Sequence, residues 1–150
     1  MTEIDFYVLA SRRPAARLEL VCRLAERACR RDQSVFVYAE DSHLLQNLDE
    51  RLWSFRPSSF VPHRVLADND MPGRHALEPV VLSSGEPSID RRILINLASE
   101  VPAFFSRFTR TLEVIDEDDS VRDQGRARYR FYQHRGYPLR HHRVKDSIQV

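Results

Sequence analysis

The stretch IDFYVLASRRPAARLELVCRLAERACRRDQSVFVYAEDSHLLQNLDERLW, residues 4–53, decides the fold of this 150-residue chain. Residues 4–9 and 35–39 are short apolar runs typical of buried strands. Between them, residues 15–30 repeat apolar side chains at helical spacing, which places on one face Leu18, Val21, Cys22, Ala25 and Cys29. A second helix is expected over residues 42–53, behind an Asp41 cap. The strand–helix–strand–helix order predicts parallel strands joined by right-handed crossovers.

The rest of the chain continues this alternation. Further strands are predicted at residues 61–65, 80–83, 93–97 and 112–115. A short helix is expected over 102–108, and a long last helix over 120–135 that ends near Gly136. We therefore expect one α/β domain over residues 1–150, with three layers and a mostly parallel sheet covered by helices on both faces. Residues 140–150 read as a polar C-terminal tail.

The amino-acid composition is typical of a globular protein, and the net charge predicts no general affinity for polyanions. Hydrophobic residues make up 42% of the chain and charged residues 30%, with a formal net charge of +1. No apolar run of about 18 residues exists, and the start MTEIDFYVLA lacks signal-peptide features, so we expect a cytoplasmic protein. Cys22 and Cys29 would lie about 10 Å apart along one helix, too far for a disulfide, and are expected in the core.

Sequence motifs for catalysis, cofactors or metals are missing. The loop after the first predicted strand is Ala-Ser-Arg-Arg-Pro, and with four glycines in the chain no phosphate-binding glycine loop can be written. His134, His141 and His142 are the one group that could converge on a metal, but their spacing matches no ligand pattern. The acidic run at residues 116–119 is interpreted as charging the first turn of the last helix. We expect no catalytic residue, cofactor or metal.

The C-terminal part of the chain is basic. From residue 121 onward there are eight Lys/Arg residues against two acids. Arg122, Arg126 and Arg130 recur every four residues, with Tyr129 beside them, which predicts one helical stripe. Such a stripe is either a solvated helix face or a binding site for an anion. With an apolar wall from Tyr129 and Ile115, it suits an acidic peptide that ends in an aromatic residue. Direct binding of a phosphate backbone would use the same residues, but the several stacking aromatics of such sites are not found.

Aromatic residues also gather in the segment LDERLWSFRPSSFVPH, residues 48–63. Trp53, Phe55 and Phe60 stand at the end of a predicted helix and in a proline-bearing loop. Loops normally run over the surface, so these rings either close the edge of the core or face a partner.

This segment, together with ILINL at 93–97 and RARYRFYQHRGYPL at 126–139, resembles the chi subunit of bacterial DNA polymerase III holoenzyme. The three segments occur in the family's order, and the likeness runs over nearly the whole chain. The resemblance implies a mononucleotide-binding (Rossmann-like) fold that has lost its nucleotide chemistry. It also implies a non-catalytic adaptor in DNA replication, whose polymerase activity resides in other subunits.

The family's two binding surfaces map onto separate parts of this sequence. The resemblance assigns Trp53 and Phe60, with Phe55 added, to a patch for the psi subunit, which tethers chi to the clamp loader; a helicase is a further candidate partner there. It assigns the acidic C-terminal tail of single-stranded DNA-binding protein to Ile115, Arg122, Arg126, Tyr129 and Arg130. Single-stranded DNA would then be contacted indirectly.

One departure from the family pattern is Gly125, which lies inside the binding helix. A glycine inside a helix lowers helix stability by about 0.5–1 kcal/mol relative to alanine, so we expect a less rigid binding site. Two other functions remain open. One is a small enzyme that binds a nucleotide or phosphorylated metabolite in the crevice at the sheet's C-terminal edge. The other is a direct binder of single-stranded DNA.

Overall fold

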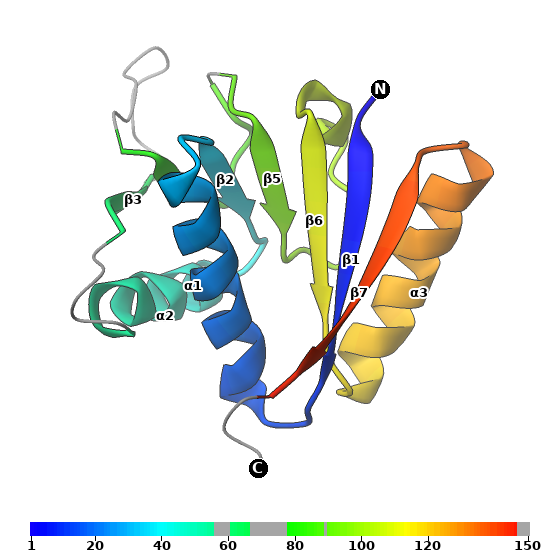
Figure 1. The fold of residues 1–150 in the computed structure, drawn as a ribbon, viewed down its shortest axis with the longest axis horizontal. Coiled ribbons are helices and arrows are strands. Elements are labelled where there is room, and N and C mark those ends of the chain that lie inside the picture. The colour runs from blue at the N-terminus through cyan, green and yellow to red at the C-terminus, as the bar shows by residue number, and fades with distance from the viewer. Residues whose placement is uncertain (56–60, 67–77, 89, 147–150) are drawn as a thin grey trace.

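A computed structural model describes residues 1–55, 61–66, 78–88 and 90–146 of the chain (Figure 1). The helices and strands follow one another in the order β1 (Glu3–Ala10), α1 (Pro14–Arg30), β2 (Val35–Tyr38), α2 (Ser42–Ser54), β3 (His63–Val65), β4 (Val80–Ser83), β5 (Ile93–Asn96), the 3-10 turn η1 (Phe105–Arg107), β6 (Arg110–Ile115), α3 (Asp119–His134) and β7 (Leu139–Lys145). Most boundaries lie within one or two residues of those expected from the sequence.

The seven strands found in the described residues pair in one parallel sheet, in the order β3-β4-β2-β5-β6-β1-β7. Helices α1 and α2 cover one face, and α3 covers the other (Figure 1). The expected three-layer α/β fold is confirmed. Among the described residues, no helix has both the length and the apolar character needed to span a membrane.

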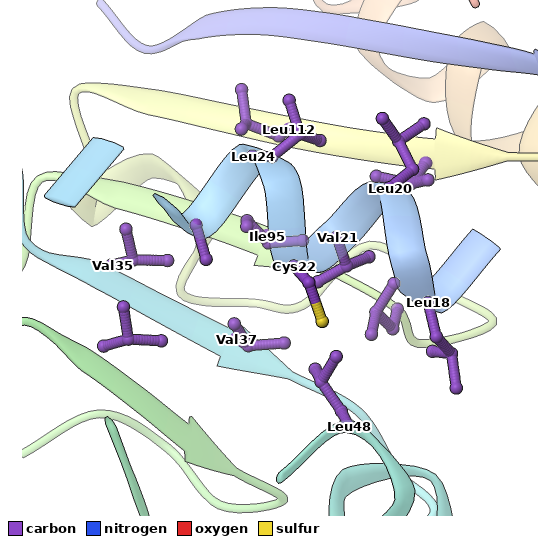
Figure 2. Packing of buried hydrophobic residues seen from close by; sticks show 14 of the residues in the cluster. Leu18, Leu20, Val21, Cys22, Leu24, Val35, Val37, Leu48, Ile95 and Leu112 are labelled. Atoms are coloured by element: carbon purple, nitrogen blue, oxygen red, sulfur yellow. The ribbon is translucent and has the colours of Figure 1, made fainter. Parts of the chain in front are cut away.

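The core lies on both faces of the sheet. The cluster under α1 and α2 contains the apolar face predicted for the first helix, and Figure 2 shows Val21 and Cys22 of α1 near Val37 of β2, with Leu48 contributed by α2. Cys22 is fully buried and Cys29 partly buried, and both are free thiols, as expected. Burial raises the pKa of the Cys22 thiol to about 12, so this sulfur stays protonated and unreactive.

The short helix predicted over residues 102–108 forms only in part. Only the 3-10 turn η1 forms there, and it brings three rings into the core beneath α3: Phe104, Phe105 and Phe108. A single tight turn suffices to bury all three, because Phe104 contacts Phe36 edge-on at 6.0 Å while Phe105 contacts Tyr132 at 5.4 Å. Aromatic burial, not helix propensity, decides the conformation of this segment.

The polar tail predicted over residues 140–150 is wrong for most of its length. Leu139–Lys145 forms β7, which pairs in parallel with β1 so that Ile4 lies opposite Leu139. This edge strand is polar because its charged side chains have partners on β1: Arg140 donates to Glu3 at 2.7 Å, and His142 lies 2.9 Å from Asp5. Charged residues on an edge strand also discourage pairing with other chains. Residues 147–150 lie outside the described part of the chain.

Candidate functional site

The orientation of α3 is fixed by a buried polar network around Glu113 of β6. Arg128 Nε donates to one carboxylate oxygen at 2.8 Å, while the Tyr132 hydroxyl and Asn96 Nδ2 donate to the other at 2.7 and 3.0 Å. Burial and the Glu113 charge raise the pKa of Tyr132, so this phenol remains a neutral donor. Because residues 128 and 132 are held one turn apart on the inner face, Arg126 and Arg130 are directed to the outer face.

The start of α3 is built by its acidic residues, in partial agreement with the sequence interpretation. Asp118 is the N-cap, and its side chain accepts from the Val121 amide at 3.1 Å, while Asp119 lies in the first turn. Asp116 has a different role, because it is buried in the preceding loop and accepts from the Asp118 amide at 3.0 Å. These carboxylates are used in capping the helix and ordering its loop.

A pocket of about 230 Å³ lies between α3 and the sheet. We call it the α3 pocket, and it is lined by Phe6, Val8, Ile115, Gly125, Arg126, Tyr129, Arg130 and His141. Four of the five residues assigned to tail binding therefore lie around one cavity. Arg122 does not line it: its Nη2 donates to Asp119 at 3.1 Å, within the first turn of the helix.

The α3 pocket has a cationic rim and an apolar floor. The Arg126 side chain is 64% exposed, and its one ion pair among the described residues is a long contact of 4.0 Å with Asp123. Arg130 is exposed and forms no ion pair with any residue that the structure describes. The Tyr129 ring packs edge-on against Phe6 at 5.3 Å and lies 5.1 Å from the His141 ring. Guanidinium groups above an aromatic and aliphatic floor suit a ligand that carries both carboxylates and an apolar group.

Gly125 has a packing role that the sequence did not reveal. A Cβ at this position would lie 2.6 Å from Cγ2 of Ile115, closer than carbon atoms approach in real structures. The glycine therefore lets α3 approach β6 closely enough for Ile115 to form the pocket floor. The helix runs without interruption through this position. The close contact with Ile115 is therefore a second constraint on Gly125, and the lower rigidity expected of a helical glycine stays a prediction.

Sequence reasoning missed three side chains of the α3 pocket. Phe6 and Val8 come from β1, and their alternation with Tyr7 shows that they share a face, but not that this face lies under α3. His141 comes from β7, a segment whose polar sequence predicts a tail. The signal that could have found these residues is the long-range register that pairs Phe6 with His141.

The aromatic patch lies at the end of α2. The Trp53 side chain is 62% exposed, and its ring contacts the ring of His63 edge-on at 5.2 Å. Nε2 of His63 lies in turn 2.9 Å from Asp49. Phe55 differs from Trp53, because it is partly buried against the core under α1 and α2. Phe60 lies outside the described residues.

The two candidate surfaces lie at opposite edges of the sheet. Trp53 and its contact His63 belong to α2 and β3, and β3 is one edge strand. The α3 pocket is bounded by β6, β1 and β7, and β7 is the other edge strand (Figure 1). A ligand on one surface therefore leaves the other surface open.

The crevice at the C-terminal ends of the strands does not suit a phosphate. A pocket of about 220 Å³ there is lined by Arg12, Pro14, Arg17, Leu18, Leu44, Asp116, Asp118 and Val121. Two carboxylates oppose an anion, and the Arg17 side chain donates to the Val114 carbonyl at 2.8 Å. The residues that line this crevice thus give no support to the nucleotide-binding or phosphometabolite-binding alternative.

The histidines considered for a metal do not converge. His141 lines the α3 pocket, whereas His142, the next residue of β7, stacks on Tyr7 on the opposite face of the sheet. Within the described residues, no group of three or more His, Cys, Asp or Glu side chains has an arrangement suited to a metal ion.

Comparison with known proteins gives concordant results. A family profile described as "DNA polymerase III chi subunit, HolC" matches residues 1–140. A protein called DNA polymerase III subunit chi from Pseudomonas aeruginosa is 44% identical over 145 residues, which cover 96% of this chain and 98% of the relative. Proteins of the same name from Haemophilus influenzae and Escherichia coli are each 31% identical, over 90% and 81% of this chain and 92% and 81% of their own lengths.

The fold also resembles a solved structure of unrelated sequence. The C-terminal domain of the DEAD-box protein Dbp5 superposes with a TM-score of 0.66 at 10% identity, over 95% of this chain and 90% of that chain. This likeness concerns the α/β fold alone.

Proposed function

Because this chain belongs to the DNA polymerase III chi subunit family, whose members are non-catalytic accessory subunits, we propose that it connects two partners in the bacterial replisome. One partner is the psi subunit of the clamp-loader complex. The other is the acidic C-terminal tail of single-stranded DNA-binding protein. The chain then acts in the cytoplasm, on the lagging strand, and touches single-stranded DNA through the protein that coats it.

The observation that carries the proposal is the α3 pocket. The acidic residues of the tail pair with Arg126 and Arg130 on the rim, and the terminal aromatic side chain lies on the floor against Ile115 and Tyr129. The floor needs no rearrangement to accept a ring, since Tyr129 is already held by Phe6. Arg122 contributes positive potential from the same helix rather than a direct contact, because its guanidinium group is bonded to Asp119.

The psi contact is assigned to the patch around Trp53. An indole that is 62% exposed and supported from beneath by His63 offers a large rigid apolar surface to a partner. Phe55 stabilises the end of α2 from the core side and supports the patch from within. A helicase is a competing candidate for the same surface.

The position of the two surfaces at opposite edges of the sheet suits an adaptor. When both partners are bound, each raises the effective concentration of the other, so moderate affinity at each site holds the assembly on coated DNA. No chemical step is required of this chain. The proposed mechanism is tethering through electrostatic and apolar contacts.

The tail contact is tested with a fluorescein-labelled acidic peptide that ends in phenylalanine, titrated with the full chain and followed by fluorescence anisotropy. Arg126→Ala is expected to weaken binding by about tenfold, equivalent to 1.4 kcal/mol. Arg30→Ala is the matched control, because Arg30 lies on α1 and its side chain is 63% exposed, close to the 64% of Arg126. The proposal fails if folded wild-type protein does not bind the peptide, or if both variants bind alike.

The psi contact is tested by co-purification of tagged psi with Trp53→Ala. The exposed position of Trp53 predicts that the variant folds normally and no longer retains psi. Arg126→Ala serves as the control and is expected to retain psi, because it alters the opposite edge of the sheet. Undiminished recovery of psi with Trp53→Ala would remove this residue from the interface.

A further inference from the structure

A third cavity lies on the face of the sheet opposite the α3 pocket. Its volume is about 440 Å³, and it is formed by the C-terminal half of α1 and the strands β5, β6, β1 and β7. It shares no lining residue with the α3 pocket, because adjacent residues of β1 and β7 point to opposite faces. We call it the α1 groove, and it is lined by Asp5, Tyr7, Leu24, Arg27, Ala28, Arg31, Gln33, Ile93, Arg110, Leu112, Arg140 and His142.

The α1 groove carries cations without matching anions. Arg27 and Arg31 lie one helical turn apart, and neither side chain forms a hydrogen bond or ion pair with any residue in the described part of the chain. Arg110 and Arg140 add two further guanidinium groups, and among the described residues Asp5 is the only carboxylate that lines the cavity.

Both oxygens of the lining carboxylate, Asp5, already have partners within the protein. Asp5 is buried, and its two oxygens contact Arg110 and His142 respectively. Just outside the cavity, Glu3 accepts from Arg110 and from Arg140, each at 2.7 Å. This network holds two of the guanidinium groups in place and leaves Arg27 and Arg31 uncompensated. The α1 groove therefore presents an ordered, net positive surface.

The same cavity contains an aromatic pair. The Tyr7 and His142 rings stack with centroids 4.5 Å apart and planes 16° from parallel, and both line the groove. The His142 side chain is 39% exposed, which leaves ring surface for a further stacking partner. Burial and then Asp5 raise the pKa of Tyr7, against opposing effects of Arg27, Arg110 and Arg31. The phenol is therefore a neutral donor on which three guanidinium groups act.

We propose that the α1 groove binds a nucleotide, either free or as one unit of a single DNA strand. Its phosphate contacts Arg27 and Arg31, and its base extends the stack of Tyr7 and His142. The cavity volume falls in the range of about 300–1,000 Å³ that is usual for small-ligand sites. An acidic peptide would satisfy the arginines but would leave the ring stack without a role. This site is independent of the proposed tail and psi contacts.

The test is fluorescence anisotropy of a fluorescein-labelled twelve-residue oligo(dT) titrated with the full chain at low salt. The double variant Arg27→Ala/Arg31→Ala is expected to bind about fivefold more weakly or worse, with a salt slope reduced by about 0.7 for the one phosphate that both arginines contact. Both side chains are exposed, so the variant should keep the wild-type melting temperature. Arg126→Ala/Arg130→Ala is the matched control in the α3 pocket and is expected to bind DNA as the wild type does.

Additional probes distinguish a free nucleotide from a nucleotide unit of a DNA strand. Displacement of the oligonucleotide by thymidine monophosphate, but not by inorganic phosphate, supports recognition of base and phosphate together. If the monophosphate binds and the strand does not, the site is for a free nucleotide. An abasic oligomer that binds as tightly as oligo(dT) overturns the placement of the base.

Three results overturn the proposal as a whole. The first is a folded wild-type protein that binds neither oligo(dT) nor the monophosphate. The second is DNA binding that disappears only in Arg126→Ala/Arg130→Ala, which would place the strand on α3. The third is displacement of DNA from that same variant by the acidic peptide, which would make the α1 groove a peptide site.

Discussion

Replacing Gly125 with alanine is expected to destabilise the protein and weaken tail binding together, although helix propensity alone predicts a more stable helix. The new Cβ would lie 2.6 Å from Cγ2 of Ile115, whereas carbon atoms in contact are normally about 3.5–4.0 Å apart. Either α3 or the Ile115 side chain must therefore move by about 1 Å. Cγ2 sits on the branched Cβ of a buried strand residue, so it cannot swing aside as the end of a long flexible side chain can.

The sign of the effect follows from two opposing magnitudes. Alanine gains about 1 kcal/mol over glycine in a helix, while overpacking a core costs about 1–3 kcal/mol. We expect a net loss of about 1 kcal/mol, which for a chain of this size lowers the melting temperature by about 2–4 °C. Because Gly125 and Ile115 both line the α3 pocket, the same movement should weaken peptide binding several-fold.

Urea denaturation and peptide titration of two further variants complete the experiment. Ala127→Gly places a glycine at an exposed position of the same helix, and is expected to cost about 1 kcal/mol while leaving peptide affinity unchanged. In a double-mutant cycle, Ile115→Ala removes the clashing atom and should make Gly125→Ala less harmful than it is in the wild type. If Gly125→Ala raises the denaturation midpoint and binds peptide normally, the close-contact argument is refuted.

Three other predictions follow from particular contacts. Tyr132→Phe removes a donor to the buried Glu113 carboxylate and should lower the free energy of unfolding by about 1–3 kcal/mol in urea denaturation. An unchanged midpoint would show that this hydrogen bond contributes nothing to stability. Hydrogen bonds from Arg13 lower the pKa of Glu19, so the stability they contribute is present above its unfolded pKa of about 4.3 and is lost as pH falls through the lower folded value. Melting temperatures of the wild type and Glu19→Gln should therefore converge in acid, and a constant difference would refute the assignment. Peptide affinity should fall as salt rises from about 50 to 300 mM, because the rim arginines are exposed, and a flat profile would contradict an electrostatic contact.

The sequence predicts the helices and strands whose apolar residues repeat at a regular spacing. It does not predict elements whose side chains are buried against residues far away in the chain. The α1 face was readable because Leu18, Val21 and Cys22 repeat at helical spacing and all face one core. The β7 strand was missed because its polar residues gain their partners, Glu3 and Asp5, only when the two ends of the chain pair. No local pattern contains that information.

The candidate site shows the same division. Arg126, Tyr129 and Arg130 share one helix, so spacing alone grouped them correctly around a pocket. Arg122 obeys the same spacing, but it does not line the pocket, and its side chain bonds to Asp119 instead. Helix propensity describes Gly125 only as part of an isolated helix, so it does not show that this residue lies against Ile115. The α1 groove could not be predicted, since its lining comes from five separate elements.

The most direct test of the adaptor account is chemical-shift mapping by NMR of the isotope-labelled full chain with the unlabelled acidic peptide. The account predicts that signals from Ile115, Tyr129 and Arg126 shift in proportion to bound peptide, while Trp53 does not respond. Shifts confined to the Trp53 patch or to the α1 groove, with the α3 pocket unaffected, would contradict it.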